Sequence, residues 1–187
     1  MNRHLRIGIL KETKTPPDRR VAVTPQQGLG LLTEYSNMEV FVQPSENRCF
    51  TDNEYLDFGH ALKKELDNCD ILLGVKEVKP YTLIPGKTYM FFAHVGKMQS
   101  YNLGLLREII KRKITLIDYE YLTDKNGRRL AAFGNWAGIV GAYNGLIAYG
   151  KRNGLFDLKP ANQCFDIEEM FIELRKVKLP VIKILIT

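Results

Sequence analysis

The sequence has few of the cysteines that stabilise small secreted proteins or bind metals. Its 3 cysteines, Cys49, Cys69 and Cys164, are odd in number and far apart, and they form no Cys-X-X-Cys pair. This argues against a disulfide framework and against a zinc site, so we expect no bound metal and a reducing, cytoplasmic setting. A strand-like segment follows the start within a few residues, where a signal peptide would have an apolar core, and we expect no signal peptide.

Long apolar runs and basic blocks are also lacking. No stretch approaches the ~18 unbroken apolar residues that a membrane span needs, so we expect a soluble protein with no membrane partner. The formal charge of +6 comes from 27 Lys and Arg against 21 Asp and Glu, and these are scattered along the chain. Because nucleic-acid surfaces concentrate basic residues among aromatics, we expect no nucleic-acid partner. A small anionic ligand explains the charge as well.

What is present is an alternation of short apolar runs with helical patterns. We predict strands at residues 6–10, 39–42, 70–76, 87–94 and 114–119, and helices at residues 25–35, 51–58 and 101–113. Thr24 and Pro25 mark a helix start, since threonine caps a helix and proline suits its first position. Parallel strands require crossover connections, so the alternation predicts an α/β fold, a Rossmann-like parallel sheet with helices on both faces.

The pattern changes after residue 120. The Asn126-Gly127 pair predicts a β-hairpin across residues 121–133. Later elements are a small-residue helix at 136–151, a helix from the Asp166 cap to residue 175, and a β-branched strand at 181–187. Such a strand needs neighbours, so we predict two domains: residues 1–134, and residues 135–187 as a linking helix and the beginning of a second α/β domain whose body lies outside this chain.

Polar side chains follow the predicted strands at the points where they end. In an open α/β sheet, ligands bind outside the carboxyl ends of the strands. The residues at such positions are Lys14, Asp18, Arg19, Arg20, Lys76, Glu77, His94, Lys97 and Glu120. They offer cations for carboxylates, carboxylates for an ammonium group, and a Lys–His pair that can move protons. Each also has a plainer interpretation, as a solvated strand end, a charged turn or, for His94, a core histidine.

Four segments together carry a family resemblance. They are residues 11–14 with 18–25, residues 74–77, residues 92–94, and residues 127–134 with the Ala137-Gly138 and Gly141-Ala142 pairs. In combination they resemble the alanine dehydrogenase and transhydrogenase superfamily, to which lysine-forming saccharopine dehydrogenase belongs. The segment at 127–134, with its Arg128-Arg129 pair, is similar to saccharopine dehydrogenase in particular.

The resemblance implies an NAD-dependent oxidative deamination in which saccharopine and water give lysine and 2-oxoglutarate. It implies acid and base roles for Lys76 and His94, and contacts with a small anionic amino-acid substrate for Lys14, Asp18, Arg20, Glu77, Lys97, Glu120 and Arg129. NAD would be held mainly by the second domain, whose glycine-rich turn this chain lacks. The Gly28-Leu29-Gly30 pair lies inside a predicted helix and is no substitute. We therefore expect this chain alone to be inactive, and its cofactor-binding residues stay unassigned.

The chemistry agrees with the implied roles. A secondary ammonium must lose a proton before hydride can leave the adjacent carbon, and water must be deprotonated to attack the resulting imine, so two proton handlers are needed. Saccharopine carries three carboxylates, which arginine recognises through a planar fork.

Two alternatives stay open. An enzyme for a smaller amino acid such as alanine would need one arginine clamp, and the Arg128-Arg129 pair argues against it. A domain that binds an anionic metabolite without chemistry is favoured by the missing nucleotide turn, whereas the set of Lys76, Glu77 and His94 argues against it.

Overall fold

The computed structural model describes residues 4–185, and the chain divides into two compact units. The first unit is Met1–Ala131 and the second is Ala132–Thr187. This division falls a few residues before the boundary predicted between residues 134 and 135. All the site residues proposed from the sequence lie in the first unit.

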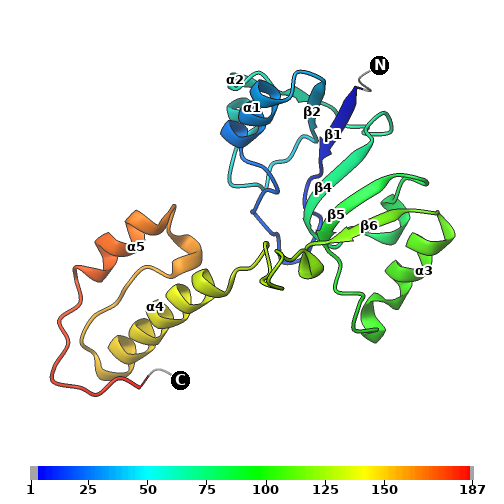
Figure 1. Ribbon diagram of the computed structural model, residues 1–187. Helices are drawn as coiled ribbons and strands as arrows, with labels where there is room; N and C mark the ends of the chain where they lie inside the picture. Colours follow the sequence, from blue (N-terminus) through cyan, green and yellow to red (C-terminus); the bar gives the residue numbers. More distant parts are fainter. Residues whose placement is uncertain (1–3, 186–187) are drawn as a thin grey trace. The chain divides into compact units, whose positions relative to one another are not determined.

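A six-stranded parallel sheet forms the first unit, in the order β3-β2-β1-β4-β5-β6 (Figure 1). The strands are β1 (Leu5–Ile9), β2 (Met38–Val42), β3 (Ala61–Leu62), β4 (Ile71–Lys76), β5 (Thr88–Phe92) and β6 (Thr115–Asp118). The strand order reverses between β1 and β4, which is the switch point where folds of this kind bind ligands. The predicted Rossmann-like parallel sheet is confirmed.

Three α helices connect these strands: α1 (Pro25–Glu34), α2 (Asp52–Asp57) and α3 (Leu103–Lys111). Short 3-10 turns are found at Pro80–Thr82, Ser100–Asn102 and Tyr119–Tyr121. Thr24 begins α1 as predicted, because its hydroxyl accepts the Gln27 N–H at 3.2 Å while the Gln27 side chain accepts the Thr24 N–H at 3.0 Å. Thr51 caps α2 in the same reciprocal way with Glu54.

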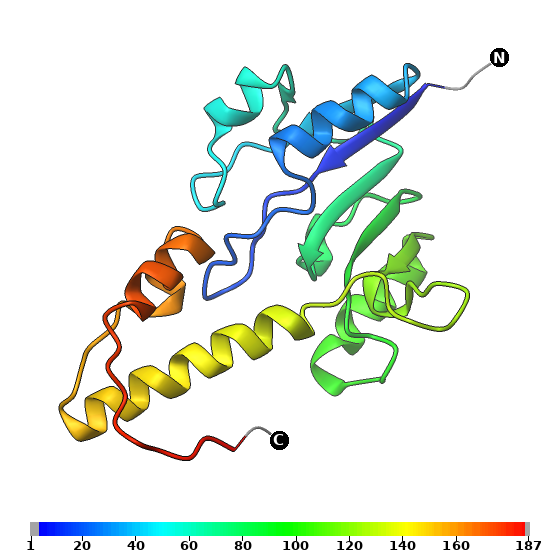
Figure 2. The ribbon, with the colours of Figure 1, turned by 60° about the vertical axis from the view of Figure 1, so that its left-hand side comes forward.

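Each face of the sheet has its own apolar core. Leu105 and Ile109 of α3 pack on one face together with Leu72, while Tyr55 of α2 packs on the other face together with Leu73. The two views agree that α1 and α2 cover one face and α3 the other (Figures 1 and 2). The central strand β4 therefore buries both of its sides, which explains its nearly continuous apolar sequence.

Two features of the first unit differ from the expectation. The strand β3 has only 2 residues, too few for an alternating pattern to show. The predicted hairpin is reduced to a single antiparallel bridge between Thr123 and Arg129 around a turn at Gly127, whose φ is 78°. The Asp124 carboxylate accepts the backbone N–H groups of Asn126 at 2.8 Å and Arg128 at 2.9 Å, so this side chain holds the turn.

The second unit is helical in its described part. It contains α4 (Gly134–Asn153), a 3-10 turn (Ala161–Gln163) and α5 (Ile167–Leu174). Tyr143, Leu158 and Met170 form its small core. Asp166 caps α5 as predicted, accepting the Glu169 N–H at 2.9 Å. Among residues 4–185, no helix is both long and apolar enough to cross a membrane.

The strand predicted at residues 181–187 is wrong for the residues that the structure describes. Residues 181–185 form no strand, and residues 186–187 lie outside the described part. A strand needs a neighbour for its backbone hydrogen bonds, and this unit offers none within residues 132–185. The β-branched side chains consequently stay exposed, as Val181 and Ile184 show.

Candidate active site

Charged residues follow the carboxyl ends of β1, β4, β5 and β6 and form ion pairs with one another. Lys76 ends β4 and Glu77 follows it, His94 comes two residues after β5, and Glu120 comes two residues after β6. Because parallel strands end at the same edge of the sheet, these side chains emerge close to the switch point between β1 and β4. This is the arrangement that the sequence predicts.

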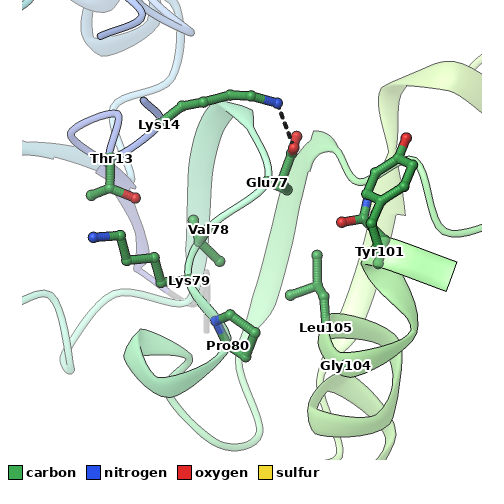
Figure 3. A pocket seen from close by; sticks show the side chains of 10 residues that line it. Thr13, Lys14, Glu77, Val78, Lys79, Pro80, Tyr101, Gly104 and Leu105 are labelled. Carbon is green, nitrogen blue, oxygen red and sulfur yellow. Dashed lines mark hydrogen bonds and ion pairs between the residues drawn. The ribbon is translucent and has the colours of Figure 1, made fainter. Parts of the chain in front are cut away.

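Glu77 links two of the predicted residues directly. The Lys14 amine donates to its Oε1 at 2.6 Å (Figure 3). His94 Nδ1 lies 3.4 Å from its Oε2. Burial raises the pKa of the Glu77 carboxyl, but the hydrogen bond from Lys14, its own backbone N–H and the charges of Lys14 and His94 outweigh burial and lower that pKa. Glu77 is therefore an ionised carboxylate held between an ammonium and an imidazole.

His94 is held in an uncommon backbone conformation. Its φ is 52°, in the left-handed region that few non-glycine residues adopt. The buried Asn102 side chain stabilises this turn by donating to the Ala93 carbonyl at 2.9 Å and to the His94 carbonyl at 3.5 Å. The His94 ring also stacks on Phe92, with ring centroids 6.3 Å apart. With Nδ1 facing Glu77, Nε2 is the nitrogen left to exchange a proton with a ligand.

Asp18 and Arg20 form a second charged pair. The Arg20 guanidinium donates twice to the Asp18 carboxylate, at 2.9 Å from Nε and 2.5 Å from Nη2. The hydrogen bond with Arg20 is the main cause that lowers the pKa of Asp18, and the charge of Lys76 lowers it further. Lys76 thus lies within electrostatic range of this pair, and its amine makes no hydrogen bond or ion pair with residues 4–185.

Glu12 is a residue that the sequence reasoning did not place in the site. Its carboxylate accepts the backbone N–H groups of Val75 at 2.7 Å and Lys76 at 3.0 Å. Burial raises the pKa of Glu12, and these two hydrogen bonds lower it by less. The available signal was its place in the Lys11-Glu12-Thr13-Lys14 segment, a few residues beyond the first strand.

Lys97 and Glu120 lie at the edge of the charged cluster. Lys97 is largely exposed and lies 3.5 Å from the Glu120 carboxylate, which belongs to the turn after β6. Tyr121 covers the backbone beside Lys97, since a Cβ on Gly96 would lie 2.0 Å from the Tyr121 hydroxyl. Lys97 and Glu120 are therefore brought together as predicted, at the rim of the charged cluster.

Within the described residues, no contact joins Arg129 to the charged cluster. It stands in the exposed turn opposite Thr123, and no hydrogen bond or ion pair within residues 4–185 joins its guanidinium to Lys76 or His94. Its predicted contact with substrate stays a prediction.

A cavity of about 270 Å³ lies beside the Lys14–Glu77 pair (Figure 3). It is lined by Thr13, Lys14, Glu77, Val78, Lys79, Pro80, Tyr101, Asn102, Gly104 and Leu105. Figure 3 shows Val78, Pro80 and Leu105 as its apolar floor, with Lys14 reaching across to Glu77 at its mouth. Lys76 and His94 do not line it, so the predicted proton-transfer pair lies outside this cavity.

NAD is the cofactor that the resemblance implies, and the described residues do not supply its binding turn. Gly28 and Gly30 lie inside α1, and Gly28 packs against the His60 ring, 2.6 Å from where a Cβ would stand. Between residues 4 and 185 no glycine-rich turn joins a strand to a helix. The charged cluster of the described residues offers groups for binding and for proton transfer.

The fold and the charged cluster define a class of protein, an α/β domain that presents acid–base and cationic groups at the switch point of a parallel sheet. The family model described as "Alanine dehydrogenase/PNT, N-terminal domain" matches residues 8–140. This chain belongs to that family.

Named relatives share part of the chain. The mitochondrial alpha-aminoadipic semialdehyde synthase of Bos taurus is 41% identical over 135 residues, which are 72% of this chain and 14% of that protein. The NAD(+), L-lysine-forming saccharopine dehydrogenase of Yarrowia lipolytica is 34% identical over 151 residues, 78% of this chain and 40% of that protein. The chain therefore spans less than half the length of either relative.

Solved structures share the fold at lower identity. A transhydrogenase from Sinorhizobium meliloti superposes with a TM-score of 0.62 at 16% identity, covering 77% of this chain and 44% of that one. An L-alanine dehydrogenase gives a TM-score of 0.58 at 20% identity, covering 79% of this chain and 40% of that one. These likenesses establish the architecture of the sheet domain.

Proposed function

We propose that this chain is the substrate-binding and proton-transfer domain of an NAD-dependent dehydrogenase acting on saccharopine. The overall reaction converts saccharopine, NAD+ and water into lysine, 2-oxoglutarate, NADH and a proton. The observation that carries the proposal is the Glu77 carboxylate held between Lys14 and His94, one residue after Lys76. The names of the relatives indicate the reaction, and the charged cluster contains cationic and acid–base groups of the kind that this reaction needs.

In this proposal Lys76 and His94 handle protons in two successive steps. One of them accepts the proton of the secondary ammonium, which frees the nitrogen lone pair. The other deprotonates the water that attacks the carbon–nitrogen double bond, and the proton then returns to the departing lysine amine. Glu77 keeps His94 Nδ1 oriented, so that Nε2 faces the ligand.

Cations of the cluster bind the substrate carboxylates in this proposal. Arg20 and Arg129 supply guanidinium forks, while Lys14 and Lys97 supply point charges. Asp18, Glu77 and Glu120 keep these cations in place and offer acceptors to substrate ammonium groups. We propose a small anionic amino acid as the ligand, and the cytoplasm as the location, since all three cysteines are free thiols.

Calorimetric titration of the 187-residue chain tests the proposal. We expect heat of binding with saccharopine and with 2-oxoglutarate, and none with alanine. Arg129→Lys should weaken saccharopine binding about tenfold, because an ammonium cannot reproduce a bidentate contact. Arg128→Lys is the matched control, since Arg128 is the exposed neighbour in the same turn and should leave the affinity unchanged. A folded chain that binds neither saccharopine nor 2-oxoglutarate would refute the proposal.

A second candidate is a domain that binds an anionic metabolite without chemistry. Lys14 and Arg20 favour it, because they are cations of the kind that hold an anionic metabolite. It predicts that 2-oxoglutarate binds as tightly as saccharopine and that His94→Gln leaves both affinities unchanged. Alanine binding as tightly as saccharopine would instead indicate an enzyme for a smaller amino acid.

A further inference from the structure

The end of β4 is the place where the sheet loses its regular pairing. The ladder with β1 ends at the Ile9–Leu73 pair, beyond which the Leu10 N–H donates to the Leu73 carbonyl at 2.8 Å. On its other side, the register of β4 with β5 shifts between Leu73 and Lys76. Lys76 pairs again with Phe92 beyond that shift, whereas Gly74 and Val75 lie between the regular pairs.

Glu12 supplies that support from the loop after β1. Its Oε1 accepts the Val75 N–H at 2.7 Å, and its Oε2 accepts the Lys76 N–H at 3.0 Å. The carboxylate thus uses both oxygens on two successive backbone donors at the irregular end of β4. The side chain is half-buried, so these bonds are partly shielded from competing water.

We propose that Glu12 is a positioning residue whose carboxylate fixes the backbone of Val75 and Lys76 and thereby holds the Lys76 amine at the rim of the site. The role of the Lys76 amine in proton transfer rests on the proposed function, whereas the contact of Glu12 with the Val75 and Lys76 backbone does not. A catalytic group displaced by about 1 Å loses much of its effect, so anchoring the residue that carries it is a functional requirement.

The chemistry of the contact explains why glutamate is needed. Each of the two N–H donors has its own acceptor oxygen in this contact, and a glutamine would turn an NH₂ donor toward one of them. Aspartate keeps both oxygens and the charge but is one methylene shorter, so it does not reach both donors. Glu12→Gln and Glu12→Asp should therefore fail alike, for different reasons.

Hydrogen exchange of backbone amides in the 187-residue chain is the first test. We expect Glu12→Gln and Glu12→Asp each to speed the exchange of the Val75 and Lys76 amides about tenfold or more, because hydrogen bonds to a charged acceptor are lost. The Leu72 amide, inside the ladder, should keep its rate. The matched control is Glu39→Gln, whose exposed carboxylate binds the Arg6 side chain and should leave all three amides unchanged.

The second test separates positioning of Lys76 from support of the backbone alone. Reductive methylation with ¹³C-formaldehyde labels the lysine amines, and the Lys76 signal is assigned by its loss in Lys76→Arg. We expect that signal to shift and broaden in Glu12→Gln and in Glu12→Asp, and to stay in place in Glu39→Gln. Faster amide exchange with an unmoved Lys76 signal would overturn the proposal, because Glu12 would then be structural only.

A third measurement does not depend on the folding of any variant. In the unsubstituted chain, scalar couplings across hydrogen bonds should join the Val75 and Lys76 amide nitrogens to the Glu12 carboxyl carbon, and their absence would overturn the contact. A chain that fails to bind saccharopine would refute the proposed function and leave these three measurements as they are.

Discussion

Glu77→Gln is the substitution that most directly tests the charged centre of the site. The change keeps the shape of the side chain and removes its charge, so Lys14 and His94 lose the carboxylate charge that lies between them. Hydrogen bonds to charged groups contribute about 1.5–3 kcal/mol. The Glu77 side chain is 18% exposed and that of Lys14 is 39% exposed, and the resulting solvent screening places the expected loss at about 1–2 kcal/mol.

The pH dependence of this loss follows from the direction of the Glu77 pKa. Because the folded pKa lies below the ordinary value of about 4.3, the carboxylate contributes stability that is fully present above that value. The contribution is lost as the pH falls through the lowered, folded pKa. Glutamine does not titrate, so the difference in stability between the two chains should be largest above about pH 5 and should shrink as the pH falls below about 4.

Urea denaturation followed by circular dichroism, repeated between pH 7 and pH 3, measures this difference. The control is Glu39→Gln on β2, which removes a pair with Arg6 whose two side chains are more exposed, and should cost far less at pH 7. Equal stability of Glu77→Gln and the unsubstituted chain at pH 7 would refute the reasoning. A difference that does not begin to shrink as the pH falls below about 4 would refute it as well, because the contribution comes from the ionised carboxylate.

Three further substitutions test the packing that supports the site, each by urea denaturation at pH 7. Gly28→Ala should destabilise by about 1–3 kcal/mol, because its Cβ would stand 2.6 Å from the His60 ring, whereas Gly30→Ala meets no atom within 4 Å and should stabilise α1 slightly. Equal effects at the two glycines would contradict this. Thr24→Ala should cost about 1 kcal/mol through loss of the helix cap, and no loss would exclude the capping box as a stabilising feature. Arg48→Met should cost about 2–4 kcal/mol, since its buried guanidinium binds two backbone carbonyls and a carboxylate; a neutral result would mean that water replaces them.

Features encoded by neighbouring residues could be predicted from the sequence. Thr24 before Pro25 and Asp166 before its helix act within one turn of chain, and both caps form as expected. The apolar run of β4 likewise reports its own burial on two faces. Local chemistry decides such elements, so a pattern of adjacent residues is sufficient to find them.

Features that depend on a distant partner could not be predicted in the same way. The β-branched segment at 181–185 has the composition of a strand, but a strand forms only where another supplies its hydrogen bonds. The contact of Glu12 with Val75 joins residues far apart in sequence, and nothing near Glu12 indicates where its carboxylate points. The composition of a segment restricts the secondary structures that it can form, and its neighbours in the fold decide which of them forms.

The structure shows how the charges of the site are paired, which the sequence did not predict. Position after a strand predicts that cations and carboxylates gather, but not that Lys14 is paired with Glu77 and Arg20 with Asp18. A substrate carboxylate that binds either cation must compete with a carboxylate already in place, and the displaced carboxylate must then find a new donor. Lys76 has no such partner among the described residues, so a ligand can engage it without displacing an acid. A ligand would then bind and exchange a proton at the same residue. Ligand binding would therefore depend more on the position of Lys76 than on the number of charges around it.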